Sequence, residues 1–278
     1  NFDKQVNREN TDSVKYDLRE EVFGKGDVLP MWVADMDFET PDFIRNAISK
    51  RLEHPVLGYT FRPERFSGAI INWVQKHHNW KVEKEWIRFS PGIVPAVNML
   101  VLALTTPGDG IIVQPPVYFP FFGAIEKNGR EKLENPLKLE NGRLQIDFDD
   151  FEKKASKAKM FILCNPHNPG GSVWTAEELA RLGEICLKHN VLVLSDEIHS
   201  DLVFGPRKHV PMASLSKELA QQTITCMAPS KTFNLAALAT SEVIIPNPMH
   251  RELFEEMLND KIHVNMGNVF GHEALIAA

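Results

Sequence analysis

The stretch TAEELARLGEICLKHNVLVLSD, residues 175–196, contains the pattern that decides the fold class. It opens with Thr175 and has Glu178 three residues later, which is the arrangement of a helix N-terminal capping box. Apolar side chains then recur at the spacing of one helix face: Leu179, Leu182, Ile185 and Cys186. This spacing predicts a helix over 175–190, and the apolar run that follows at 191–195 is typical of a buried strand.

The same alternation of strand-like and helix-like segments continues along the chain. Short apolar runs, most of them rich in β-branched residues, predict buried strands at 111–113, 160–163, 191–195, 223–228 and 242–246. The segment 93–104 is apolar on nearly all sides, which predicts a buried helix. This order of elements predicts an α/β fold built around a mainly parallel sheet.

The overall composition limits the possible functions. Of the 278 residues, 43% are hydrophobic and 24% are charged, as in soluble globular proteins, and no apolar run is long enough to span a membrane. The net charge of −6 gives no reason to expect nucleic acid or an anionic membrane as a partner. Cys164, Cys186 and Cys226 lie in apolar segments without metal-ligand spacing, so we expect reduced core residues in a cytoplasmic protein and no zinc site. The polar start of the chain does not have the pattern of a signal sequence.

Polar residues follow several of the predicted strands, where ligands bind in parallel sheets. Asn168 lies in the turn CNPHNPGG (164–171), Asp196 ends an apolar strand, and Lys231 stands among small and apolar residues. A buried lysine there should be paired, exposed or chemically modified. Taken singly, each feature also fits a structural role: a rigid turn, a helix cap or ion pair, and a solvated loop.

Two further segments contribute candidates. Gly92, Ile93 and Val94 stand at the start of the predicted buried helix, where free N–H groups and the helix dipole favour an anion such as phosphate. Tyr118 follows a predicted strand and is either a core aromatic or a platform on which a ring could stack. The carboxylate, amide, tyrosine, lysine and phosphate site together fit one cofactor.

Five motifs resemble those of one enzyme family: MWVADMDF (31–38), GYTFRP (58–63), NPHNPGG (165–171), SDEIHSDL (195–202) and APSKTFNLA (228–236). Across its whole length the chain resembles fold-type I pyridoxal-phosphate enzymes of the aspartate aminotransferase superfamily. Within them it is most similar to the cystathionine β-lyase (C–S lyase) branch of MalY- and PatB-like proteins. Asp196 follows Asn168 by 28 residues (196 − 168) and precedes Lys231 by 35 residues (231 − 196), as that superfamily requires.

The resemblance implies a domain organisation. The large cofactor-binding domain would span residues 48–278 and contain a mainly parallel seven-stranded sheet between helices. Residues 1–47 would form the N-terminal part of a small domain, whose C-terminal part, with the arginine for the substrate carboxylate, is expected to lie outside this chain.

The resemblance also implies the roles of the site residues. Lys231 would carry pyridoxal 5'-phosphate covalently, Asp196 would pair with the ring nitrogen, and Lys231, Tyr118 and Asp196 would be catalytic. Asn168 would donate to the phenolic oxygen of the ring, Tyr118 would stack on it, and His199 would support the same face or orient the carboxylate.

The cofactor phosphate is expected to be held by a second group of residues. The resemblance implies that Gly92, the amides of Ile93 and Val94, and the Ser230 hydroxyl surround it. Tyr59 would reach the phosphate of the neighbouring subunit, so the active unit would be a homodimer with shared sites.

The reaction implied is β-elimination at the C–S bond of cystathionine or a related cysteine S-conjugate, giving a thiol, pyruvate and ammonia. An aminotransferase on the same scaffold would share nearly every residue, but Ala239 stands where many aminotransferases have a phosphate-binding arginine, which favours the lyase. A third alternative is a MalY-like regulatory role, in which the protein binds a transcription activator.

Overall fold

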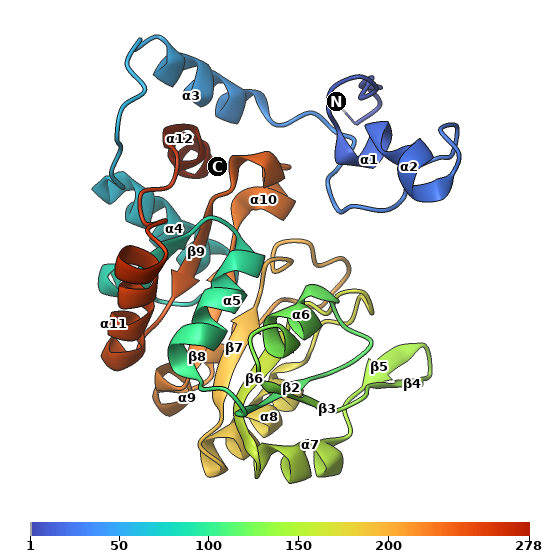
Figure 1. Ribbon diagram of the computed structural model, residues 1–278, viewed down its shortest axis with the longest axis vertical. Helices are drawn as coiled ribbons and strands as arrows, with labels where there is room; N and C mark the ends of the chain where they lie inside the picture. The colour runs from blue at the N-terminus through green and yellow to red at the C-terminus, as the bar shows by residue number, and fades with distance from the viewer. Residues whose placement is uncertain (1) are drawn as a thin grey trace.

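The computed structural model describes residues 2–278 and has a seven-stranded sheet at its centre (Figure 1). The strand order is β1-β9-β8-β7-β6-β2-β3. The strands are β1 (Ile87–Ser90), β2 (Gly110–Val113), β3 (Glu131–Glu134), β6 (Ala158–Cys164), β7 (Leu192–Asp196), β8 (Thr223–Met227) and β9 (Ser241–Ile244). A separate two-stranded sheet pairs β4 (Lys138–Glu140) with β5 (Arg143–Gln145).

The sheet is mainly parallel, as predicted. Parallel pairing joins β3, β2, β6, β7 and β8, whereas β9 runs antiparallel to both of its neighbours, β8 and β1. The central strands β2, β7 and β8 are buried at every position, which explains why their sequences are continuous apolar runs. Sequence patterns missed β1 and β3, which form the two edges of the sheet.

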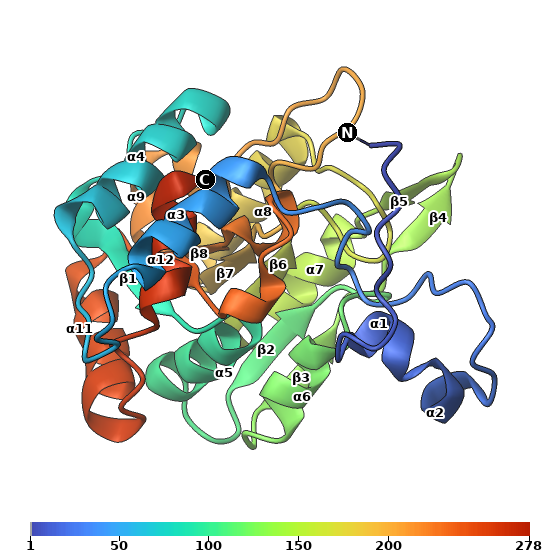
Figure 2. The same ribbon diagram turned by 90° about the horizontal axis from the view of Figure 1, so that it is seen from above.

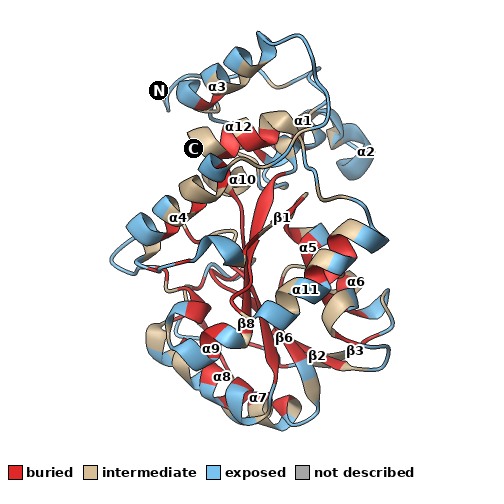
Figure 3. Cartoon of the chain, turned by 90° about the vertical axis from the view of Figure 1, so that its left-hand side faces the viewer, coloured by how far each residue is buried: buried red, intermediate tan, exposed pale blue. Residues whose placement is uncertain are grey.

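Helices cover both faces of the sheet, and buried residues concentrate between the layers (Figure 3). One face packs against α5 (Ile93–Leu104), α6 (Pro120–Glu126) and α11 (Pro248–Glu256). The other packs against α4 (Glu64–His78), α7 (Phe148–Ala155), α8 (Ala176–Lys188) and α9 (Lys217–Gln221). Cys164, Cys186 and Cys226 are buried and free, as predicted.

The helix that the opening pattern predicts is α8. Thr175 Oγ1 accepts a hydrogen bond from the Glu178 amide at 3.2 Å, and Glu178 Oε2 accepts one from the Thr175 amide at 2.8 Å. This reciprocal pair is the predicted capping box. The predicted buried helix at 93–104 is also confirmed, with the same bounds, as α5.

The N-terminal region is less regular than the rest. It contains the short helices α1 (Val14–Asp17) and α2 (Arg19–Phe23), which lie at the edge of the molecule (Figure 2), and then an irregular segment before α3 (Asp42–Leu52). Helix α3 packs against the C-terminal α12 (Val269–Ala277). The predicted boundary between residues 47 and 48 falls within α3, and the division into two domains stays a prediction. No helix within residues 2–278 is both long and apolar enough to cross a bilayer.

Candidate active site

The candidate site lies where β6, β7 and β8 end. Asp196 is the last residue of β7, and its register partner on β6 is Cys164, which begins the predicted turn. After β8 the chain enters α10 (Pro229–Thr232), a short helix that starts with a proline and contains Lys231. Parallel strands therefore bring the predicted carboxylate and lysine to the same end of the sheet.

Asp196 is a deeply buried carboxylate with few donors. Its side chain accepts a hydrogen bond from the Ile198 amide at 3.1 Å. Burial raises the pKa of Asp196 to about 7, and the Ile198 amide and Lys231 offset this only in part. A buried carboxylate in this position favours a cationic or hydrogen-bond-donating group against it.

Lys231 is only partly exposed and has two carboxylates around it. Burial lowers the pKa of Lys231, whereas the charges of Asp35 and Asp196 raise it. Burial and the charge of Lys231 both lower the pKa of His199, and burial and the charge of Asp196 raise that of Tyr118. The structure thus brings Lys231, Asp196, His199 and Tyr118 into one electrostatic neighbourhood.

The predicted anion site is the N-terminus of α5. Gly92 is the N-cap residue and has a φ of +146°, a conformation that L side chains rarely adopt. Glycine has no side chain to cap the helix, so the first amides, at Ile93 and Val94, remain suited to an anion. Ser230 lies in α10, next to Lys231 in the chain.

The structure places two of the predicted site residues, Asn168 and Tyr59, differently from each other. The backbone N–H of Asn168 donates to Cys164 Sγ at 3.2 Å, which holds the turn after β6 close to the strand end. The Tyr59 side chain projects from the protomer with a residue exposure of 97%, so the protomer does not bring it into its own site. The roles of all these residues stay predictions.

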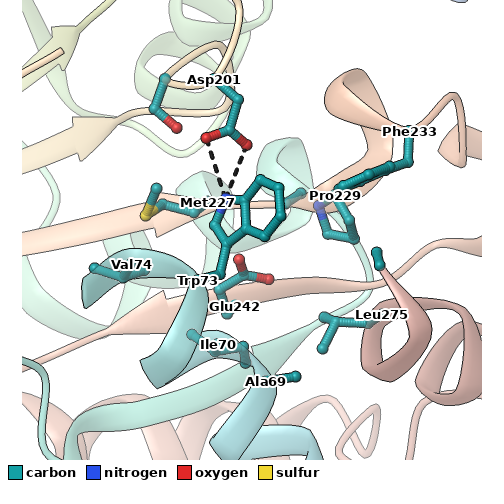
Figure 4. Close-up of a pocket in the computed structure, with 13 residues that line it drawn as sticks. Ala69, Ile70, Trp73, Val74, Asp201, Met227, Pro229, Phe233, Glu242 and Leu275 are labelled. Atoms are coloured by element: carbon teal, nitrogen blue, oxygen red, sulfur yellow. Dashed lines mark hydrogen bonds between the residues drawn. The ribbon is translucent and has the colours of Figure 1, made fainter. Parts of the chain in front are cut away.

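Asp201 is a residue that sequence reasoning missed. It accepts hydrogen bonds from Trp73 Nε1 at 3.1 and 3.2 Å (Figure 4), from His78 Nε2 at 2.9 Å and from Thr232 Oγ1 at 2.7 Å. Burial acts to raise the pKa of Asp201, but these hydrogen bonds outweigh it and lower the pKa. Since Thr232 follows Lys231, Asp201 anchors the lysine helix to α4. In the sequence, the only sign of a role for Asp201 is its place in the SDEIHSDL motif.

A small pocket of about 50 Å³ is lined mainly by apolar side chains, which come from α4, from residues 227–233 and from residues 275–278 (Figure 4). It also contains the Glu242 carboxylate, whose Oε2 is buried without a hydrogen bond from any described residue. Burial and the charge of Asp201 raise the pKa of Glu242 to about 8.

Asn234 ties the irregular N-terminal segment to the lysine segment, a contact that no sequence pattern indicated. Its Oδ1 accepts from the Met36 amide at 3.0 Å, and its Nδ2 donates to the Met36 and Phe38 carbonyls, each at 3.0 Å. Asp35 therefore enters the site from a part of the chain almost 200 residues away from Lys231 in sequence (231 − 35 = 196).

Known proteins resemble this chain in sequence and structure. Over 260 residues it is 52% identical to cystathionine β-lyase PatB of Bacillus subtilis, a match that covers 93% of the chain and 67% of PatB. A crystal structure of a pyridoxal-phosphate-bound putative aminotransferase from Clostridium difficile superposes with a TM-score of 0.97 at 46% identity, covering 100% of the chain and 72% of that protein. A pyridoxal-phosphate-bound C–S lyase from Staphylococcus hominis gives 0.91 at 35% identity, covering 100% and 70%.

The family model for aminotransferase class I and II matches residues 27–248. This range holds the whole central sheet and every candidate site residue. The chain therefore belongs to the class I and II aminotransferase family.

Proposed function

We propose that this protein binds pyridoxal 5'-phosphate and catalyses β-elimination at the C–S bond of cystathionine or a related cysteine S-conjugate. The observation that carries the reaction type is the 52% identity, over 93% of the chain, to a cystathionine β-lyase. The geometry supports the cofactor, because a buried carboxylate and a lysine both lie at the carboxyl end of the sheet.

The residues present fit this cofactor. The charge of Lys231 offsets the raised pKa of buried Asp196 only in part, and a protonated pyridine nitrogen would supply a further cationic partner. The uncapped start of α5 suits the phosphate, with the amides of Ile93 and Val94 as donors. Lys231 would carry the cofactor. When bound, the cofactor supplies the electron sink that stabilises negative charge on the substrate Cα.

The remaining candidates would hold the ring and its phosphate. Asn168 would donate to the phenolic oxygen, and Ser230 and Gly92 would line the phosphate site. Tyr118 would cover one face of the ring, and His199 would support it from the neighbourhood of Lys231. His199 is suited to this as a neutral imidazole, because burial and Lys231 lower its pKa.

Lys231 would move the protons in the reaction. Its lowered pKa makes the free amine available as a base for the proton on Cα of the substrate. Lys231 is free to do this once the amino group of the substrate has displaced it from its covalent bond. As the Cα proton leaves, the Cβ–S bond breaks and its electron pair departs with sulfur. The protonated lysine then returns a proton to the thiolate, and the unsaturated amino acid takes up water to give pyruvate and ammonia.

The proposed active unit is a homodimer with shared sites, in which Tyr59 reaches the phosphate of the partner subunit. Apolar side chains that a second subunit could cover support this: Leu29, Met31, Tyr59 and Phe61 are each more than three-quarters exposed. The substrate is a small amino acid, and we propose no nucleic-acid or membrane partner for this site. A cytoplasmic location stays a prediction from composition.

The deciding experiment feeds cystathionine to the cofactor-loaded protein without any keto acid. Pyruvate and homocysteine formed over many turnovers are the expected result, and the Lys231→Ala variant serves as the control. A single turnover that stalls until a keto acid is added would instead identify an aminotransferase, the alternative that shares these residues.

A further inference from the structure

Glu197, the residue after Asp196, is a buried carboxylate that accepts hydrogen bonds from three separate residues. Its Oε1 accepts from Ser195 Oγ at 2.8 Å and from the backbone N–H of Met212 at 3.1 Å. Its Oε2 accepts from His209 Nε2 at 2.7 Å. The side chains of Glu197 and His209 are shielded from solvent, with exposures of 0% and 1%. These hydrogen bonds fix the carboxylate, because losing any of them would leave a buried charge less well satisfied.

His209 connects this carboxylate to the helix that carries Lys231. Its Nδ1 is buried without a partner among the described residues, which suits a ring that carries its proton on Nε2 and donates it to Glu197. The ring of His209 meets that of His78 edge to face, with centroids 5.2 Å apart. His78 in turn donates to Asp201, the residue that anchors the lysine helix. One buried set of contacts therefore reaches from the end of β7 to α10.

Glu197 and Asp196 project to opposite faces of the sheet. Leu194, two residues before Asp196, packs in the core cluster that contains α5, where the phosphate site is expected. Val193 packs on the other face, in the cluster that contains Met212. Glu197 reaches the Met212 N–H on this second face, as the alternation of side chains along a strand requires. Glu197 thus holds the end of β7 from the face opposite to the candidate site.

Asp196 has far fewer contacts of its own. Among the described residues, its carboxylate accepts a hydrogen bond only from the Ile198 N–H, at 3.1 Å. An ionised carboxylate can accept about four hydrogen bonds, so most of this capacity is left for a ligand. A side chain with a single donor does little to fix the strand end on which it stands. That task falls to the neighbouring Glu197, with its three donors.

We propose that Glu197 and His209 are positioning residues that aim the Asp196 carboxylate at the ring nitrogen of the cofactor. They act from the opposite face of the sheet and contact neither cofactor nor substrate. Glu197 holds the end of β7, and His209 supplies its third donor and closes the loop 197–209 at its base. This inference rests on the proposed function, in which Asp196 pairs with the ring nitrogen.

The test compares pyridoxal 5'-phosphate with its 1-deaza analogue, in which carbon replaces the ring nitrogen. Equilibrium dialysis of each compound against cofactor-free protein gives two dissociation constants, a readout that does not require turnover. The parent should bind pyridoxal phosphate about tenfold more tightly than the analogue, as expected for a charged hydrogen bond to Asp196. Glu197→Ala should bring this ratio close to one. A merely structural role would weaken both compounds alike and leave the ratio unchanged.

Two milder variants grade the effect. Glu197→Gln keeps an oxygen that can accept from Ser195 and Met212 but loses the acceptor for His209. His209→Ala removes the same hydrogen bond from the other side. Both should therefore lower the ratio to a similar extent, and less than Glu197→Ala does. They carry the test alone if Glu197→Ala does not fold.

Glu178→Ala is the matched control. Glu178 also accepts several hydrogen bonds, from Arg143 and from the Thr175 N–H, but it does so at the start of α8. Its loss should lower the free energy of unfolding and leave the ratio of the two dissociation constants at the parent value. A ratio that falls as far in Glu178→Ala as in the Glu197 and His209 variants would contradict a specific positioning role.

The remaining outcomes separate this inference from the proposed function. An unchanged ratio in the Glu197 and His209 variants, beside a parent that distinguishes the two compounds, would overturn the positioning role alone. A parent that binds both compounds equally would overturn the role of Asp196 toward the ring and this inference with it. If the ratio falls as expected in a protein that does not cleave cystathionine, the lyase proposal fails while the positioning role stands.

Discussion

Replacing Asp196 by asparagine should stabilise the cofactor-free protein and reduce the stability that cofactor binding adds. Asparagine keeps the shape of the side chain and can still accept the hydrogen bond that the Ile198 amide donates at 3.1 Å. It removes the charge that burial disfavours. The variant therefore separates the cost of burying the carboxylate from its use as a partner for the ring nitrogen.

The magnitude follows from the pKa of Asp196, which burial raises from 3.8 to about 7. A raised folded-state pKa means that the folded protein holds the proton more tightly than the unfolded chain. The contribution of Asp196 to the free energy of unfolding is therefore full below pH 4, falls as the pH rises, and is lost above pH 7. About three pKa units correspond to a cost on the order of 4 kcal/mol at high pH.

The assay is urea unfolding of parent and variant at pH 5, 7 and 9, with and without pyridoxal phosphate. Without cofactor, the advantage of Asp196→Asn should grow from pH 5 to 7 and then level off. With cofactor, the parent should gain more stability than the variant. Glu242→Gln is the control, because burial raises the pKa of Glu242 to about 8 but no cofactor role is proposed for it. It should stabilise both forms alike.

Two results of the unfolding experiment would contradict the prediction for Asp196→Asn. If Asp196→Asn were no more stable than the parent without cofactor at pH 9, the buried carboxylate would not be the burden that its surroundings indicate. If added cofactor stabilised Asp196→Asn as much as the parent, Asp196 would have no role toward the ring.

Three further predictions concern the site. Borohydride should fix the cofactor to the parent but not to Lys231→Ala, and loss of this base should slow elimination by about 10²–10⁴-fold or more; a reducible covalent cofactor in Lys231→Ala would contradict the assignment. Asp201→Asn should lower the free energy of unfolding, measured in urea, by about 1–3 kcal/mol, because Asp201 accepts hydrogen bonds from three side chains including that of Thr232. A change below about 0.5 kcal/mol, which is roughly the effect of a surface substitution, would argue against its anchoring role. Tyr59→Phe subunits mixed with Lys231→Ala subunits should regain activity in hybrid dimers if sites are shared, and complete failure would count against sharing.

The sequence predicted those parts of the fold that depend on local patterns. The bounds of α5 and the capping box of α8 follow from short apolar or polar patterns that the surrounding structure does not override. The edge strands were missed because IRFS (87–90) and EKLE (131–134) are only four residues long and contain polar or charged residues, so neither is a continuous apolar run. Their strand structure depends on pairing with a neighbour, which no local pattern reports.

Local sequence patterns likewise predicted only part of the candidate site. Asp196 and Lys231 could be predicted because each follows or ends an apolar strand. The network around them could not, because its partners are distant in sequence: Asp201 lies 123 residues from His78, and Asn234 lies 198 residues from Met36. Only the fold brings these pairs together, so a motif can contain such a residue without revealing what it does.

The two carboxylates whose charges act on Lys231 are held in different ways. Asp35 has Arg8 and Lys15 as partners, whereas Asp196 has a backbone amide and burial that disfavours its charge. Under the proposed function, the ring nitrogen becomes the cationic partner of Asp196. Cofactor binding would then relieve the cost of the buried Asp196 charge, and this relief is what the comparison of Asp196→Asn with the parent, with and without cofactor, measures.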